Sequence, residues 1–200
     1  MSSHDLRVVL IHGLWDDPKV FNRLITCLAQ KNVLVFAPYL PHRGGRTSLR
    51  DCAVELNKLI LERFGVNQQI NLLGFSMGGL ISRVWLQKMG GAVRTNSFIS
   101  VGSPHLGTLT AQLVPSFVLS GVADMKCGSN LLRELNKDIS LLNGVRCTSY
   151  YCQWDLMVFP SWHAVLPIGS SHSVPVLTHK GLITQPKSLE ILTNAIFSNC

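Results

Sequence analysis

The sequence has few charged residues. Asp, Glu, Lys and Arg together make up 14% of the 200 residues, whereas 46% are hydrophobic. This composition excludes a disordered chain, because so many apolar residues can bury a substantial core. Internal repeats, low-complexity segments and an obvious linker are also absent. We therefore expect residues 1–200 to form a single domain.

Targeting and membrane signals are weak. The segment MSSHDLRVVLIHG lacks the basic, apolar and small-residue order of a secretory signal peptide. Residues 95–123 contain no Asp, Glu, Lys or Arg, but Pro104, Pro115 and the polar residues among them make a poor membrane span. We predict a cytoplasmic protein, with peripheral membrane contact as an option.

The net charge of +7 is not accompanied by a nucleic-acid motif. The 18 Lys and Arg residues are scattered, and no basic block is interleaved with aromatic residues. We therefore expect no nucleic-acid partner. The positive net charge is more simply interpreted as an attraction to anionic lipid head groups or acidic substrates. The sequence does not indicate an oligomeric state.

Metal-binding patterns are missing as well. The six cysteines form no CxxC pair, and there is no HExxH motif. We expect neither a metal nor a cofactor, and we interpret the cysteines mostly as reduced core residues.

What the sequence does contain is an alternation of strand and helix patterns. A cap at Asp17-Pro18 opens a helix to about residue 31, Ser48 opens another that ends at Gly65, and further helices are predicted at 77–89 and 187–198. The pattern predicts an α/β three-layer sandwich with a mainly parallel sheet of about six strands. The predicted strands are 6–11, 33–37, 70–73, 97–101, 145–151 and 173–177.

Residues 104–142 interrupt this alternation. Their first half is apolar and contains Pro115, and their second half has an amphipathic helical pattern. We expect the segment to act as a short lid or cap over a site, although its first half is equally compatible with a buried crossover helix.

The segment LLGFSMGGL, residues 72–80, places Ser76 between a predicted strand and a predicted helix. This is the setting of a nucleophile elbow, in which a strained turn requires small residues at Gly74 and Gly78. A serine nucleophile needs a histidine to take its proton and an acid to orient that histidine.

Partners for Ser76 should follow later strands, at the same edge of the sheet. Among the acids after Ser76, only Asp155 directly follows a predicted strand, and His179 follows the next one. The other histidines are less suitable: His163 and His172 are interpreted as solvated loop residues, and His12 as a structural residue that holds a turn. The remaining acids are assigned to exposed helical faces or to other segments: Asp124, Glu134, Asp138 and Glu190.

An oxyanion hole requires two backbone N–H donors. Met77, which opens the helix after Ser76, supplies one. Gly13 permits a sharp turn after the first strand that would direct the amide of Leu14 inward.

Five segments in this order resemble the α/β-hydrolase superfamily, specifically its small lipases and esterases: HGLW, GFSMGG, GSPHLGT, WDLMVFP and LTHKGLI. The resemblance implies a minimal α/β-hydrolase fold with Ser76 as nucleophile, Asp155 as acid, His179 as base, and Leu14 and Met77 as oxyanion donors.

We therefore predict a serine hydrolase that cleaves carboxylic esters with an apolar acyl chain, such as small-molecule esters or lipids. An acyltransferase or thioesterase using the same residues, or a non-catalytic receptor that keeps the pocket, remain alternatives. Candidate acyl-binding residues are Trp15, Phe75, Leu106, Leu109, Leu113 and Phe117, although several of them could equally belong to the core.

Overall fold

The computed structural model describes residues 6–29, 33–115 and 119–198. Its centre is a six-stranded sheet in the order β2-β1-β3-β4-β5-β6, with every neighbouring pair parallel. This arrangement confirms the predicted α/β fold. The strands are β1 (Leu6–Ile11), β2 (Val33–Phe36), β3 (Ile70–Phe75), β4 (Thr95–Val101), β5 (Arg146–Tyr151) and β6 (Ser170–Ser173).

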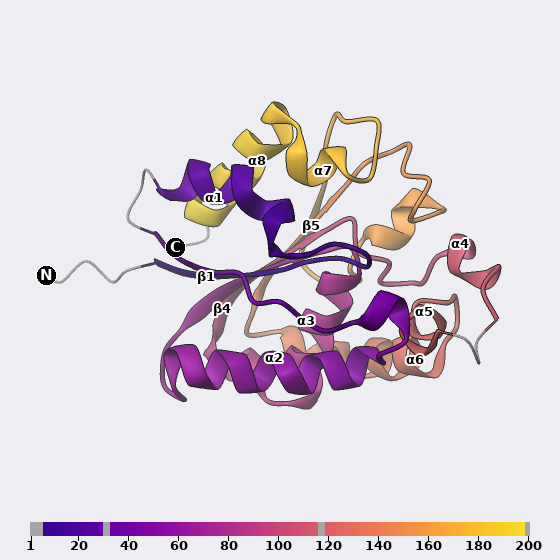
Figure 1. The fold of residues 1–200 in the computed structure, drawn as a ribbon, viewed down its shortest axis with the longest axis horizontal. Coiled ribbons are helices and arrows are strands. Elements are labelled where there is room, and N and C mark those ends of the chain that lie inside the picture. Colours follow the sequence, from indigo (N-terminus) through magenta and orange to yellow (C-terminus); the bar gives the residue numbers. More distant parts are fainter. Residues whose placement is uncertain (1–5, 30–32, 116–118, 199–200) are drawn as a thin grey trace, which may run out of the picture.

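Helices cover both faces of the sheet (Figure 1). On one face lie α1 (Asn22–Ala29), α7 (Gly181–Thr184) and α8 (Pro186–Ser198), and on the other lie α2 (Leu49–Phe64), α3 (Met77–Lys88) and α6 (Asn130–Lys137). Two further helices are short, α4 (Leu109–Gln112) and α5 (Ser120–Asp124). Single 3₁₀ turns are η1 (Pro18–Phe21), η2 (Arg43–Gly45), η3 (Gly91–Arg94), η4 (Ile139–Leu142) and η5 (Ser161–Ala164).

Strand alternation explains the two hydrophobic cores. In β1, Val8 and Leu10 belong to the cluster on the α1 and α8 face, while Val9 and Ile11 belong to the cluster on the α2 and α3 face. Successive side chains of a strand point to opposite faces, so a strand that is apolar throughout must be covered on both sides.

The helix ends follow the predicted signals. The side chain of Asp17 accepts a hydrogen bond from the amide of Lys19 at the start of η1, and Ser48 accepts one from the amide of Asp51 in α2. The C-terminal residue of α2 is followed by Gly65, whose φ of 64° requires a residue without a side chain. These local contacts fix where α2 begins and ends.

The predicted sixth strand was wrong. We predicted residues 173–177, but β6 comprises Ser170–Ser173, and its four side chains are exposed. An edge strand can pair through its backbone alone, so its sequence carries no hydrophobic signal. The apolar residues Val174 and Val176 follow the strand and pack into the core beneath the α8 face.

The excursion at 104–142 divides into two parts that pack differently. In its second half, Leu131, Leu132 and Leu135 of α6 are buried against the α2 and α3 face, as the amphipathic pattern predicts. The part around α4 and α5 instead lines a cavity that is described below. Within the described residues, no helix is both long and apolar enough to cross a membrane.

Candidate active site

The strand order reverses between β1 and β3, and this reversal places two chain segments side by side. β1 and β3 are adjacent and parallel, yet their connections leave in opposite directions, to β2 and to β4. Ligands of open α/β sheets bind in the crevice at the C-terminal ends of such strands. Here the turn at Gly13 follows β1, and Ser76 follows β3.

Ser76 occupies a strained turn between β3 and α3. Its φ of 54° and ψ of −125° lie in a region that non-glycine residues rarely adopt. Such a conformation costs on the order of 1–3 kcal/mol and persists only when its surroundings hold it. The amide of Ser76 donates to the carbonyl of Val101 at 2.8 Å, which ties the turn to β4.

Gly74 and Gly78 allow this turn because the backbone is crowded around them. A Cβ at Gly78 would lie 2.1 Å from the carbonyl oxygen of Ile11, and one at Gly74 would lie 2.5 Å from Cα of Gly79. Neither neighbour can move without moving a strand or a helix. The small residues are therefore required at both positions, as the motif predicts.

Asp155 and His179 are brought into direct contact. Asp155 Oδ2 lies 2.7 Å from His179 Nδ1, and Oδ1 accepts from the amides of Met157 at 2.8 Å and Val158 at 3.0 Å. The carboxylate is 2% exposed. Its burial is therefore offset by three hydrogen bonds.

The contact with Asp155 defines what His179 can do. Because Nδ1–H donates to the carboxylate, the neutral ring keeps a lone pair on Nε2. His179 Nε2 is buried and has no hydrogen-bond partner among the described residues. The ring packs on Phe75, with 4.9 Å between the ring centroids. His179 thus presents a free acceptor from a fixed ring.

The other acids have different partners. Glu134 pairs with Arg50, and Asp138 pairs with Lys88, both on the surface. Asp124 accepts the amide of Leu49 at the start of α2, and burial raises the pKa of its carboxyl. Glu190 is exposed on α8.

Ser76 and His179 line one apolar cavity. Its volume is about 260 Å³, and residues of the excursion form most of its wall. These are Pro104, Thr108, Thr110, Ala111, Val114, Leu119, Val122 and Met125.

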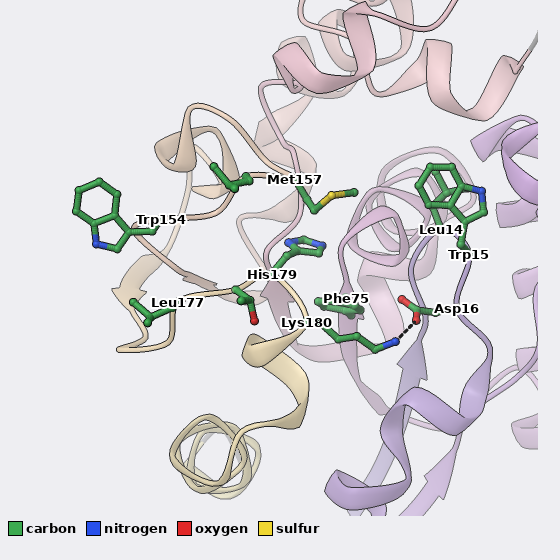
Figure 2. Close-up of a pocket in the computed structure, with 11 residues that line it drawn as sticks. Leu14, Trp15, Asp16, Phe75, Trp154, Met157, Leu177, His179 and Lys180 are labelled. Atoms are coloured by element: carbon green, nitrogen blue, oxygen red, sulfur yellow. Dashed lines mark ion pairs between the residues drawn. The ribbon is translucent and has the colours of Figure 1, made fainter.

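A wider cavity of about 430 Å³ opens beside it, and the two share Leu14, Trp15, Asp16, Met157 and His179 (Figure 2). His179 therefore lies where a deep apolar chamber meets a more open one.

The predicted acyl-binding residues divide into two groups. Trp15 and Phe75 line the wider cavity. Leu106, Leu109 and Leu113 line neither cavity, and Leu113 is 87% exposed. On the same segment, Thr110, Ala111 and Val114 line the deep cavity instead. Phe117 lies outside the described residues.

The two residues whose amides are predicted to form an oxyanion hole belong to segments that meet at Ser76. Met77 begins α3, so its N–H has no partner within the helix. Leu14 follows Gly13, where an added Cβ would lie 3.0 Å from Cβ of Ser76. The turn after β1 therefore approaches the elbow closely, and both Leu14 and Ser76 line the deep cavity.

Several histidines have structural roles. His12 Nε2 accepts from the amide of Leu40, and Nδ1–H donates to the carbonyl of Gly13, so the ring holds the turn as predicted. The interpretation of His163 as solvated was wrong, because the half-buried ring bonds to the carbonyl of Gly107 at 2.8 Å. His172 is exposed but lies in β6 rather than in a loop.

His105 was not singled out from the sequence, although it lies in the GSPHLGT motif. Its side chain is fully buried, and its Nε2 lies 2.6 Å from Ser100 Oγ. Burial, and then the positive charge of Arg83, keep the pKa of His105 well below its ordinary value. A histidine flanked by apolar residues and proline is a signal for such burial, but burial alone does not reveal its partner.

No cluster of His, Cys, Asp and Glu suited to a metal ion occurs in residues 6–29, 33–115 and 119–198. The described cysteines are unpaired thiols, and burial raises the pKa of Cys52 to about 11 and that of Cys147 to about 12. Thiols with such pKa values are poor nucleophiles at neutral pH.

A comparison with known protein families shows to which family the chain belongs. The family model of palmitoyl protein thioesterase matches residues 7–155, from β1 to Asp155. The chain belongs to the palmitoyl protein thioesterase family. The matched region includes Ser76 and Asp155, and His179 lies beyond it.

Solved α/β-hydrolases share the fold of this thioesterase family member. The mature lipase BlEst2 of Bacillus licheniformis is 14% identical, with a TM-score of 0.77 over 98% of this chain and 93% of that one. The monoacylglycerol lipase of Paleococcus ferrophilus is 14% identical, with a TM-score of 0.72 over 97% and 95%. A comparison with curated protein sequences gives no significant match.

Proposed function

We propose that this member of the palmitoyl protein thioesterase family hydrolyses carboxylic esters of apolar acyl chains through an acyl-enzyme on Ser76. The observation that carries the proposal is the convergence of three segments at one cavity. Ser76 and His179 both line it, and His179 is held by the buried Asp155.

The proposed reaction has two halves. Ser76 Oγ attacks the carbonyl carbon of the acyl group while its proton passes to Nε2 of His179. The protonated ring is stabilised by Asp155 and returns the proton to the leaving alcohol. Water then repeats the sequence on the acyl-enzyme and releases the carboxylic acid.

The charge that develops on the carbonyl oxygen needs donors that are already in place. We assign this role to the amides of Leu14 and Met77. The close approach of the Gly13 turn to Ser76, and the start of α3 directly after Ser76, support this assignment. Donors held in a site that excludes water stabilise such an oxyanion by several kcal/mol.

Thioesters are the second candidate substrates, and the family match is the observation that favours them. The acyl half of the reaction would be the same. Only the leaving group would differ, because a thiol departs instead of an alcohol. The apolar wall around Val114, Val122 and Met125 suits the acyl chain in both cases.

A substrate panel tests the proposal. Wild-type protein and Ser76→Ala are assayed with nitrophenyl esters and with acyl thioesters of increasing chain length. We expect the wild type to prefer longer chains over acetyl, and Ser76→Ala to lose activity on both series. A preference for acetyl, or equal activity of the two proteins, would contradict the proposal. The ratio of wild-type activity on the esters to that on the thioesters identifies the preferred leaving group.

A further inference from the structure

Three of the four tryptophans are exposed. Trp15, Trp154 and Trp162 are 67%, 68% and 64% exposed, whereas Trp85 is buried in α3. The exposed tryptophans come from distant segments: the turn after β1, the loop after β5, and η5. Exposed apolar side chains that gather in one place mark interaction surfaces more often than single ones do.

These side chains surround the mouth of the candidate active site. Trp15, Trp154, Leu156 and Leu177 line the wider cavity. Trp154 and Leu156 also line a neighbouring hollow of about 480 Å³ together with Trp162. We call Trp15, Trp154, Leu156, Trp162 and Leu177 the apolar rim. In Figure 2, Trp154 and Leu177 lie on one side of the cavity and Trp15 on the other, with His179 between them.

The segments that form the rim are almost free of negative charge. Residues 156–189, which include Leu156, Trp162 and Leu177, contain Lys180 and Lys187 but no Asp or Glu. Asp155, which follows Trp154, is buried and paired with His179.

The acids beside Trp15 are balanced by nearby cations. Asp16 lies 3.6 Å from the ammonium group of Lys180. Asp17 shares a surface hollow with Lys180, Lys19 and Arg23. The surroundings of the rim are therefore apolar and weakly positive.

We propose that the apolar rim docks on the surface of a membrane that contains anionic lipids, with the mouth of the cavity facing the lipid. Indole rings are favoured at the boundary between head groups and acyl chains, and basic residues are attracted to anionic head groups. A chain of net charge +7 adds to this attraction. Docking requires no catalytic step, so it extends beyond the proposed function.

A membrane explains the rim better than a protein partner does. Four of the rim residues line an open cavity, and Trp162 lines the hollow beside it, so the rim projects around two depressions. Fluid acyl chains and head groups can surround projecting side chains of this kind, and an acylated substrate could pass from the membrane into the cavity.

Vesicle sedimentation tests the docking. Wild-type protein is mixed with vesicles of phosphatidylcholine alone and of phosphatidylcholine with phosphatidylserine. We expect binding to the second kind, weakening as salt is added. The double rim variant Trp154→Ser/Trp162→Ser should partition onto these vesicles at least about tenfold more weakly, because two large side chains no longer enter the lipid.

The matched control is Val66→Ser/Val93→Ser. Both valines are exposed, and they lie after α2 and in η3, which lead into the N-terminal ends of β3 and β4. This variant should bind vesicles as the wild type does. Absence of wild-type binding to anionic vesicles, or equal losses in the rim and control variants, would overturn the proposal.

Two further measurements separate docking from catalysis and from self-association. Ser76→Ala should bind vesicles like the wild type. Trp162→Ser should hydrolyse a soluble short-chain ester at the wild-type rate but a vesicle-embedded ester more slowly. A wild-type dimer in size-exclusion chromatography that the double rim variant dissociates would instead assign the rim to a protein interface and overturn membrane docking.

Discussion

At the scale of single residues, the proposed chemistry depends on how His179 is held. Asp155 is bound by two backbone amides and by His179 Nδ1, so the carboxylate cannot rotate away from the ring. Phe75 packs against the ring, and Gly102 leaves room for it: a Cβ at residue 102 would lie 3.1 Å from Cε1 of His179. The ring is thereby held at the cavity that Ser76 also lines.

Asp155→Asn tests this arrangement. An amide in place of the carboxylate no longer fixes the same tautomer or stabilises the protonated ring, so we expect kcat to fall by about two to four orders of magnitude. The measurement is steady-state hydrolysis of a nitrophenyl ester. Asp138→Asn, which changes an acid paired with Lys88 on the surface, is the control and should retain wild-type activity. Equal activities of the two variants would remove Asp155 from the mechanism.

At the scale of elements, the junction of β3 and α3 brings the helix so close to β1 that only glycine fits at position 78. The Cβ of an alanine there would lie 2.1 Å from a strand carbonyl oxygen. We expect Gly78→Ala to lower the free energy of unfolding by about 2 kcal/mol or more. Denaturant titration measures it.

Gly144→Ala is the matched control for this substitution. No heavy atom lies within 4 Å of the Cβ that it would add. The control should therefore unfold close to the wild type. Equal stabilities of Gly78→Ala and Gly144→Ala would contradict the crowding at the elbow.

The short helix α4 determines one wall of the deep cavity. Ala111 lines it, whereas Leu113 is exposed on the same segment. Ala111→Phe should fill the chamber and shift the optimum of kcat/KM towards shorter acyl chains. Leu113→Phe places a phenyl ring on the same segment but outside the cavity and should keep the wild-type profile. Identical profiles of the two variants would exclude the deep cavity as the acyl site.

Sequence patterns predicted those elements whose signals are local. The caps at Asp17 and Ser48, the buried strands and the motif around Ser76 all depend on neighbouring residues. The edge strand β6 was misplaced because its side chains are exposed, and the inward face of α4 was missed because a single helical turn has too few residues to show a periodicity.

Contacts between distant segments could be anticipated only through topology. Asp155 and His179 were selected because each follows a predicted strand, and the structure places them 2.7 Å apart. The contact between Ser100 and His105 could not be predicted in this way, because nothing in the sequence indicates that these two side chains meet.

At the scale of the whole molecule, buried neutral histidines link stability to pH. Burial lowers the pKa of His12 below 6.5, and burial and Arg83 lower that of His105 much further. As the pH falls below about 6.5, these two histidines bind protons in the unfolded chain but stay neutral in the folded chain. Stability should therefore be lost with acidification, by up to about 1.4 kcal/mol per pH unit for each histidine.

Comparing His105→Gln with the wild type isolates one of these contributions. The variant cannot titrate at this position, so its free energy of unfolding should fall less steeply between neutral pH and pH of about 5. The wild type measured in parallel is the reference for this slope. Denaturant titrations at several pH values measure both. A slope unchanged in His105→Gln would show that His105 is not held neutral.

The central claim is that Ser76 is the nucleophile, and fluorophosphonate labelling followed by peptide mass spectrometry tests it most directly. The account predicts one phosphonyl adduct, on the peptide that contains Ser76, in the wild type, and no adduct in Ser76→Ala. An unlabelled wild-type protein, or labelling that persists undiminished in Ser76→Ala, would contradict it.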